Sequence, residues 1–294
     1  MPVSPATPTS ASGALLADAT RLGPAELTVT RLDRSVAFYH EVVGLRVHRR
    51  DDASAVLGAG AEEVIVLHES PAARPPGRHA GLYHVALLYP SRAELARAAA
   101  RVAATRTPIQ GASDHGTHEA IYLPDPDGNG LELAADRPRG EWPDLSGPGG
   151  YAAGPAPLDV RALLDAVAGE PSRRQAEPGL RVGHVHLHVG DLDATRRFYV
   201  DGLGLEVMTD LGSALFFSFA GYHHHVGANV WRGPGVPPAP DDVVGLRHWT
   251  LLVASAGELA AVRDRLAAGG APEVERPDGL LARDPAGIAV LVRT

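Results

Sequence analysis

An internal repeat constrains the fold of this chain more than any other feature of its sequence. Leu32-Asp33 and Phe38-Tyr39 recur 160 positions later, as Leu192-Asp193 and Phe198-Tyr199. The segment Val43-Gly44-Leu45 also recurs at that offset. Landmarks that return in the same order at a fixed spacing indicate a chain built from similar structural units.

The repeats divide the chain into four strand–helix–strands units of about 50 residues each, at residues 24–70, 81–136, 182–232 and 246–294. Units two and four each contain a capping box, Ser91–Glu94 and Ser255–Glu258, which starts a helix. Helices are also expected at Leu32–Tyr39, closed by Gly44, and from about Asp159 to Ala168. Apolar runs predict strands at residues 24–30, 46–49, 64–67, 83–88, 120–123, 131–133 and 247–252.

The domain organisation follows from the same division. Residues 1–22 are rich in Pro, Ser, Thr and Ala and are expected to form a flexible tail. Residues 23–138 and 182–294 are predicted to be two domains of two units each. Residues 139–181 form the linker between them, with one embedded helix.

Composition limits the classes of function. A net charge of −8, with no Lys/Arg-rich block, argues against nucleic-acid binding. No apolar run approaches the roughly 20 residues of a membrane span, and no signal peptide is recognisable, so a cytoplasmic protein is expected. Cysteine is absent, so a metal would be held by His, Asp or Glu.

The segment from Gly183 to Val189 alternates imidazole and aliphatic side chains, as a strand with two different faces does. Three histidines, His184, His186 and His188, therefore project to one side. Ring nitrogens need polar partners, so such a face is either solvated or a metal site.

The four units, with their D-L-D…F-Y and D-P-D-G-N-G-x-E-L landmarks, resemble the vicinal oxygen chelate superfamily of glyoxalase, bleomycin resistance and extradiol dioxygenase proteins. The resemblance is greatest to its catechol 2,3-dioxygenase-like members and covers about residues 22–138 and 180–294. It implies an α+β fold in which four βαβββ units pair into two cup-shaped mixed sheets. It also implies a metal held by two histidines and one glutamate.

Superposition of the units places the first-strand ligand positions at Pro24, His84, His184 and His248, and the last-strand glutamate positions at Glu132 and Leu291. Neither half of the chain then has a complete set. If unit two pairs with unit three and unit one with unit four, one cup holds His84, Glu132 and His184 and the other holds no carboxylate. Pairing of unit three with unit four is the alternative.

The resemblance also implies the catalytic residues. Tyr122 occupies the position of an acid/base tyrosine, and His225 or His224 that of the acid/base histidine. His115, with His118 as the alternative, matches a histidine that contacts substrate. His186 and His188 are assigned to support of the ligands, and contact of the metal with His186, His188 or His248 stays open. His40, His48, His68 and His79 are expected to be surface residues.

The implied function is extradiol cleavage of catechol or a substituted catechol by Fe(II) and O₂, giving a 2-hydroxymuconic semialdehyde. Mn(II) accepts the same ligands. The alternatives are a hydroquinone-cleaving dioxygenase, a glyoxalase-type metalloenzyme, or a non-catalytic protein that sequesters a small molecule such as a drug. The sequence leaves open whether the chain forms a homo-oligomer.

Overall fold

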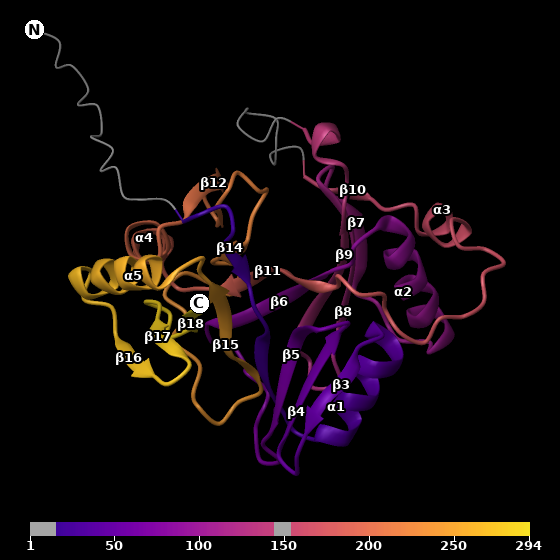
Figure 1. Ribbon diagram of the computed structural model, residues 1–294, viewed down its shortest axis with the longest axis horizontal. Coiled ribbons are helices and arrows are strands. Elements are labelled where there is room, and N and C mark those ends of the chain that lie inside the picture. The colour runs from indigo at the N-terminus through magenta and orange to yellow at the C-terminus, as the bar shows by residue number, and fades with distance from the viewer. Residues whose placement is uncertain (1–15, 144–153) are drawn as a thin grey trace, which may run out of the picture.

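The computed structural model describes residues 16–143 and 154–294, which form two mixed sheets flanked by helices (Figure 1). Most of the predicted tail, residues 1–15, and part of the predicted linker, residues 144–153, lie outside the described residues. The first described strand lies before residue 23, because β1 (Arg21–Leu22) pairs with β15 (Gly245–Leu252). The side chain of Leu16 is already buried.

Each of the four units has the expected βαβββ order. Units one and two contain β2 (Ala25–Val29), α1 (Leu32–Phe38), β3 (Arg46–Arg50), β4 (Ser54–Ala59), β5 (Glu62–Glu69), β6 (Gly81–Leu88), α2 (Arg92–Ala104), β7 (Gly111–Asp114), β8 (His118–Pro124) and β9 (Gly130–Asp136). Units three and four contain β11 (Arg181–His188), α4 (Leu192–Arg197), β12 (Glu206–Asp210), β13 (Ala214–Ser218), β14 (Val226–Asn229), β15, α5 (Ala256–Ala268), β16 (Glu273–Arg276), β17 (Gly279–Arg283) and β18 (Ala289–Arg293).

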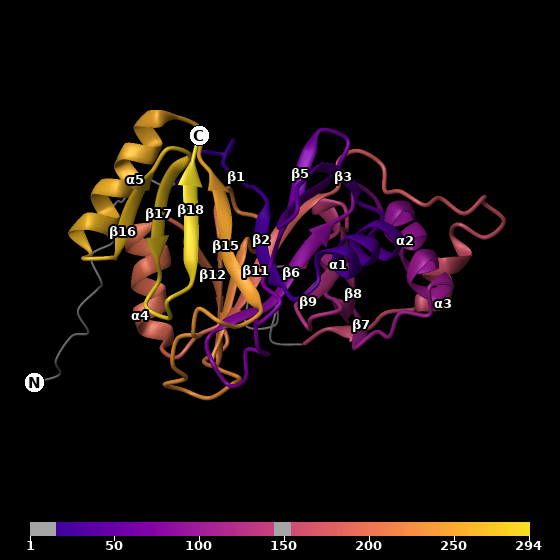
Figure 2. The same ribbon diagram turned by 90° about the horizontal axis from the view of Figure 1, so that it is seen from below.

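The sheets exchange units between the two halves of the chain, as predicted. One nine-stranded sheet has the order β10-β7-β8-β9-β6-β11-β14-β13-β12 and joins unit two to unit three. The other has the order β16-β17-β18-β15-β2-β5-β4-β3, with β1 beside β15, and joins unit one to unit four (Figure 2). Antiparallel pairs, β6 with β11 and β2 with β15, make each junction.

The repeated sequence landmarks form buried links between consecutive units. The Tyr39 hydroxyl donates to Asp125 in the turn of unit two, and the Tyr199 hydroxyl donates to Asp284 in the turn of unit four, each over 3.2 Å. In the same way, Arg101 of α2 donates to the carbonyl oxygen of Val43, which ends the first helix of unit one. These contacts hold the helices of neighbouring units together (Figure 1).

Four helices were predicted with boundaries, and the boundaries agree with the structure at three of them. Ser91 and Ser255 accept hydrogen bonds from the amides of Glu94 and Glu258, as capping boxes require. Gly44 closes the first helix with φ of 93°, after a π-helical turn over Tyr39–Val43 that the sequence did not indicate.

The predicted linker is more structured than expected. Its helix α3 (Val160–Asp165) is shorter than the expected Asp159–Ala168, and a 3₁₀ turn spans Arg139–Glu141. The two-residue strand β10 (Ala156–Pro157) joins the edge of the unit 2–unit 3 sheet. Within residues 16–143 and 154–294, no helix has the length and apolar character of a membrane span.

Candidate metal centre

Strand register brings three polar side chains together in the unit 2–unit 3 sheet. On β11, the aliphatic residues between the histidines are fully buried on the opposite face, which leaves His184 and His186 on the concave side. In the ladder His186 lies opposite His84 of β6. Glu132 of β9 is the parallel neighbour of Ala86, two residues further along β6. All these side chains therefore share one face.

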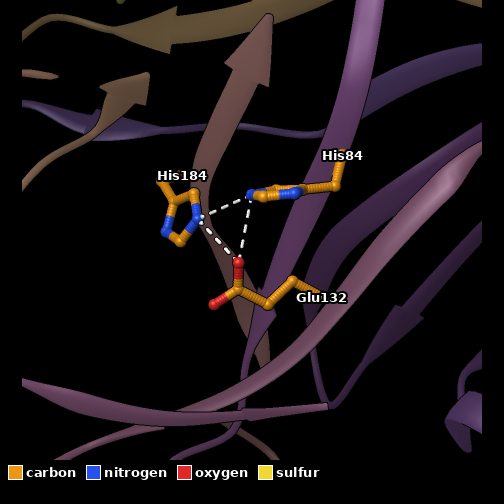
Figure 3. A group of neighbouring side chains, drawn as sticks. All are labelled: His84, Glu132 and His184. Atoms are coloured by element: carbon orange, nitrogen blue, oxygen red, sulfur yellow. Dashed lines mark hydrogen bonds and ion pairs between the residues drawn. The ribbon is translucent and has the colours of Figure 1, made fainter. Parts of the chain in front are cut away.

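The ligand atoms of His84, Glu132 and His184 converge on one point (Figure 3). Oε2 of Glu132 lies 3.0 Å from Nε2 of His84 and 3.2 Å from Nε2 of His184. The two Nε2 atoms are 3.3 Å apart. All three side chains are buried. Among the described residues, this is the one group of such side chains whose ligand atoms all lie within 4.8 Å of one another.

These residues fit a divalent metal ion. Two ligands at right angles on an octahedral metal, each about 2.1 Å from it, are about 3 Å apart, which is close to the spacing found here. Oε1 of Glu132 is buried and lacks a hydrogen-bond partner among the described residues, which is costly for a carboxylate that binds nothing else. Two imidazoles and one carboxylate are the ligand set of non-haem Fe(II) sites.

The electrostatics of the site favour the protonation states that a metal needs. Burial alone would raise the pKa of Glu132, but the charge of His184 and the close approach of the His118 and His84 side chains outweigh it and hold that pKa well below its usual range. Burial lowers the pKa of His184, although Glu132 opposes the shift. The site therefore offers a carboxylate and a neutral imidazole, which are the metal-binding forms.

His118 orients the carboxylate rather than lying at a distance from it. Its Nε2 is 3.0 Å from Oε1 of Glu132, close but outside hydrogen-bond geometry, and its Nδ1 shares a 2.8 Å hydrogen bond with the Thr117 hydroxyl. His115 stacks on His118 with ring centroids 4.5 Å apart. Of the two predicted alternatives for a substrate-contacting histidine, the structure thus puts His118 against the ligand Glu132.

Tyr122 and His115 form a second polar pair beside the three ligands. Tyr122 is the cross-strand neighbour of Glu132, and its hydroxyl lies 2.7 Å from Nε2 of His115. Its ring centroid is 5.6 Å from that of His84. Burial, with the charge of His118 adding to it, lowers the pKa of His115 to about 4. His115 is therefore neutral and can exchange a hydrogen bond with the phenol.

The run His223–His225 separates into residues that face the centre and one that does not. The His224 ring is 4.1 Å from the His184 ring, centroid to centroid. The His225 ring stacks on Phe219 at 3.7 Å, and its Nδ1 shares a 2.8 Å hydrogen bond with Ser218. His224 thus lies beside a ligand, whereas His225 packs against the end of β13.

The two other histidines of β11 are held by one amide. Asn229 of β14 donates from Nδ2 to Nε2 of His186 over 3.0 Å, and its Oδ1 is 2.8 Å from Nδ1 of His188. His186 packs edge-on against His84, with ring centroids 5.1 Å apart. Neither His186 nor His188 belongs to the converging group.

The unit 1–unit 4 sheet has different side chains at the equivalent positions. Its ligand positions hold Pro24, His248 and a buried Leu291. Nε2 of His248 is 3.5 Å from Oε1 of Glu26, whose Oε2 is 2.6 Å from Nε2 of His68. His68, one of the expected surface residues, has a side chain that is 30% exposed and paired with Glu26.

Several residues near the centre had no signal in the sequence. Tyr83 packs between His84 and His186 and meets Trp231 edge-on at 5.5 Å. Both aromatic side chains are partly exposed. Asp136 binds Tyr222 and approaches His223. A period-two pattern assigns a residue to a face, but it does not identify these cross-strand partners.

Comparisons with known proteins agree with this geometry. The sequence profile described as "Glyoxalase/Bleomycin resistance protein/Dioxygenase superfamily" matches residues 21–133 and 181–291. The catechol-2,3-dioxygenase of Bacillus subtilis (strain 168) is 39% identical over 271 residues, which are 90% of this chain and 94% of that protein.

Solved structures agree on the fold. A structure from Bacillus subtilis subsp. subtilis str. 168 has a TM-score of 0.63 at 16% identity, and covers 92% of this chain and 84% of its own. Glyoxalase I of Zea mays has a TM-score of 0.60 at 18% identity, and covers 93% of this chain and 92% of its own.

Proposed function

The chain belongs to the glyoxalase/bleomycin resistance/dioxygenase superfamily, and on this basis we propose that it is an extradiol dioxygenase that cleaves catechol or a substituted catechol. The observation that carries the proposal is the converging group of His84, His184 and Glu132, with a single carboxylate. The name of the 39% identical relative supports the choice of catechol. The product would be a 2-hydroxymuconic semialdehyde.

His84, His184 and Glu132 would hold Fe(II), and Mn(II) suits the same ligands. When bound, the metal makes catechol hydroxyls more acidic and brings catechol and O₂ to one centre. Three protein ligands leave coordination positions open for both reactants. The buried surroundings of the group exclude bulk water from it.

Two protein groups would handle protons. His224, whose ring lies beside that of His184, would accept a proton from a catechol hydroxyl, while the electron pair stays on the catechol oxygen. Tyr122, oriented by His115, would donate a hydrogen bond to a substrate oxygen. The predicted alternative acid/base, His225, is turned toward Phe219, which makes it the weaker candidate.

The chemistry of the residues argues against two of the alternatives. Glyoxalases generally offer two carboxylates to their metal, and only Glu132 lies in the converging group among the described residues. A protein that only sequesters a ligand has no need for three converging donors and an oriented tyrosine. A hydroquinone-cleaving dioxygenase would use the same residues. It must therefore be distinguished from a catechol dioxygenase by the substrates that it cleaves.

The test is anaerobic reconstitution of the purified protein with Fe(II), followed by O₂ uptake with a panel of catechols and hydroquinones. We expect about one iron per chain and a yellow ring-cleavage product from a catechol. O₂ uptake with hydroquinones alone would select the rival dioxygenase. Failure to bind iron, with no uptake on any substrate, would reject the enzyme.

Two substitutions sharpen the test. Glu132→Ala removes the only carboxylate of the group, so we expect loss of bound iron and of ring cleavage. His248→Ala removes the histidine at the equivalent position of the other cup and should leave iron content and kcat within about twofold. Iron content measured by atomic emission checks both. Loss of iron in His248→Ala with retention in Glu132→Ala would place the metal in the unit 1–unit 4 sheet and contradict the assignment of the three ligands.

A further inference from the structure

The unit 1–unit 4 sheet has a cavity at the place that corresponds to the candidate metal centre of the other sheet. Its volume is about 360 Å³, within the range of about 300–1,000 Å³ that is usual for small-molecule sites. His248 and Leu281, which line it, are the counterparts of His84 and Tyr122 in the repeat. The cavity therefore has the position of an active site but different chemical groups.

The lining of this cavity is positively charged. Among the described residues that form it, the only acidic side chain is that of Asp241, against four arginines. Over the whole chain the balance is the opposite, with 35 acidic and 27 basic residues. One of the arginines, Arg247, stands where unit two has Tyr83. We call this space the arginine cavity, after Arg232, Arg247, Arg276 and Arg283.

Three of the four arginines have no carboxylate partner among the residues that the structure describes. The exception is Arg276, whose Nε lies 3.1 Å from Oδ1 of Asp278. Arg232 is half-buried and donates to the carbonyl oxygen of His79 over 2.8 Å. Burial lowers the pKa of Arg232. A guanidinium that loses water without gaining a carboxylate favours the binding of an anion beside it.

His248 adds an unsatisfied polar group to the same lining. Its side chain is 7% exposed, and its buried Nε2 has no hydrogen-bond partner within the described parts of the chain. Burial lowers the pKa of His248; Glu26 and Asp278 oppose the shift, while the positive charges of Arg276 and Arg247 add to it. The arginines and this imidazole therefore belong to one electrostatic environment.

We propose that the arginine cavity is a second ligand site, which binds a small carboxylate with an apolar body. A guanidinium matches a carboxylate in shape and charge, and can bind it through two parallel hydrogen bonds. Leu246, Leu281 and Ile288 provide an apolar wall for the rest of the molecule. The candidate metal centre offers a carboxylate and two imidazoles to a cation, whereas its counterpart offers guanidinium groups to an anion.

Benzoate and its neutral analogue benzamide test this site. Isothermal titration calorimetry is performed on the full-length protein, both metal-free and loaded anaerobically with Fe(II). We expect about one benzoate per chain, a Kd that agrees within about twofold between the two forms, and benzamide binding weaker by about tenfold or more. Equal binding of the two compounds, or no binding of benzoate, would overturn the proposal.

Two further outcomes of the titration would also contradict the proposal. Benzoate binding to the iron-loaded form alone would assign benzoate to the metal. Binding of inorganic phosphate as tight as that of benzoate would show that the apolar wall has no role. The measurement involves neither O₂ nor turnover, so its result is independent of the proposed function.

Substitutions locate the binding site. Arg247→Gln and Arg232→Gln each remove a guanidinium from the cavity, and each should weaken benzoate binding by about tenfold. Arg46→Gln is the matched control, because Arg46 is an exposed arginine of β3 in the same sheet and does not line the cavity. Glu132→Ala should also leave the Kd for benzoate unchanged. An unchanged Kd in both cavity variants, or an equal loss of binding in Arg46→Gln, would contradict the proposal.

Discussion

Glu132 is the residue on which the candidate centre depends most. One of its oxygens lies 3.0 Å and 3.2 Å from two histidine nitrogens, while the other approaches His118. Because the carboxylate is 1% exposed, it can stay ionised only through these neighbours or a metal. The sequence identified Glu132 by its position after the Asp-Pro turn. It did not indicate that His118 lies against this carboxylate.

The distinction between His224 and His225 gives a direct test at this scale. His224→Ala should lower kcat roughly 10²- to 10⁴-fold, as expected for loss of a positioned general base. His225→Ala removes a ring that stacks on Phe219 and bonds Ser218, so it should lower the free energy of unfolding by about 1 kcal/mol and leave kcat nearly unchanged.

Kinetics and urea unfolding of the two alanine variants decide between them. The opposite assignment of effects would return the acid/base role to His225. Sequence reasoning alone could not choose between His224 and His225. Both follow a turn that includes Ala220 and Gly221, each at φ near +60°, and strand alternation does not apply there.

Among the secondary-structure elements, the repeated landmarks serve the fold more than the chemistry. The tyrosine of each Phe-Tyr pair is fully buried and donates to the aspartate of an Asp-Pro turn in the next unit. This explains why the Phe-Tyr pair recurs in units one and three and the Asp-Pro turn in units two and four, whereas the converging ligand group is drawn from units two and three alone. A motif that recurs at a fixed offset predicts packing, and a residue that breaks the repeat predicts function.

Some of the strands that the sequence did not indicate are short: β7 has four residues and β10 has two. Such strands have little room for a period-two pattern, and their pairing is decided by neighbours distant in the chain. The first strand of unit three was predicted because its alternation of imidazole and aliphatic side chains is complete.

The turn of unit four should make stability depend on pH. Burial, against hydrogen bonds from Ile288, Tyr199 and Ala286, raises the pKa of Asp284 from 3.8 to about 6. Because the folded value is the higher one, Asp284 adds to the free energy of unfolding below about pH 4 and loses that contribution as the pH rises through 6.

Asp284→Asn removes this dependence. Relative to wild type, the variant should gain roughly 1–3 kcal/mol in free energy of unfolding between pH 4 and pH 8. Urea unfolding at both pH values measures the difference, and Asp264→Asn, an exposed substitution on α5, is the control. An equal change with pH in both variants would show that Asp284 does not titrate as described.

At the scale of the whole molecule, neither half of the chain can build its own cup. The metal ligands come from both halves, and the helices of consecutive units are held by Tyr39–Asp125 and Arg101–Val43 contacts across the two sheets. Register against the repeat predicted this exchange correctly, since only one pairing completes the ligand set. We therefore expect the two sheets to unfold together.

Trp249, buried in the unit 1–unit 4 sheet, can report on this coupling. With Trp142 and Trp231 replaced by Phe, Trp249 is the only tryptophan. Metal at 100 times its Kd should add about 2.7 kcal/mol to the free energy of unfolding, and Trp249 fluorescence should follow the same transition as circular dichroism. Glu132→Ala in this background should show no metal effect. A Trp249 fluorescence transition that is the same with and without metal would mean that the sheets unfold separately.

The junction between β2 and β15 has a consequence for synthesis on the ribosome. Glu26 and His248, which lie opposite each other in that junction, are 222 positions apart. At about 5–20 residues per second, the first strand waits roughly 10–45 s for its partner. During that interval the nascent chain exposes an unpaired strand edge, which is a template for association with other chains. β2 therefore needs protection by a chaperone until β15 has been made.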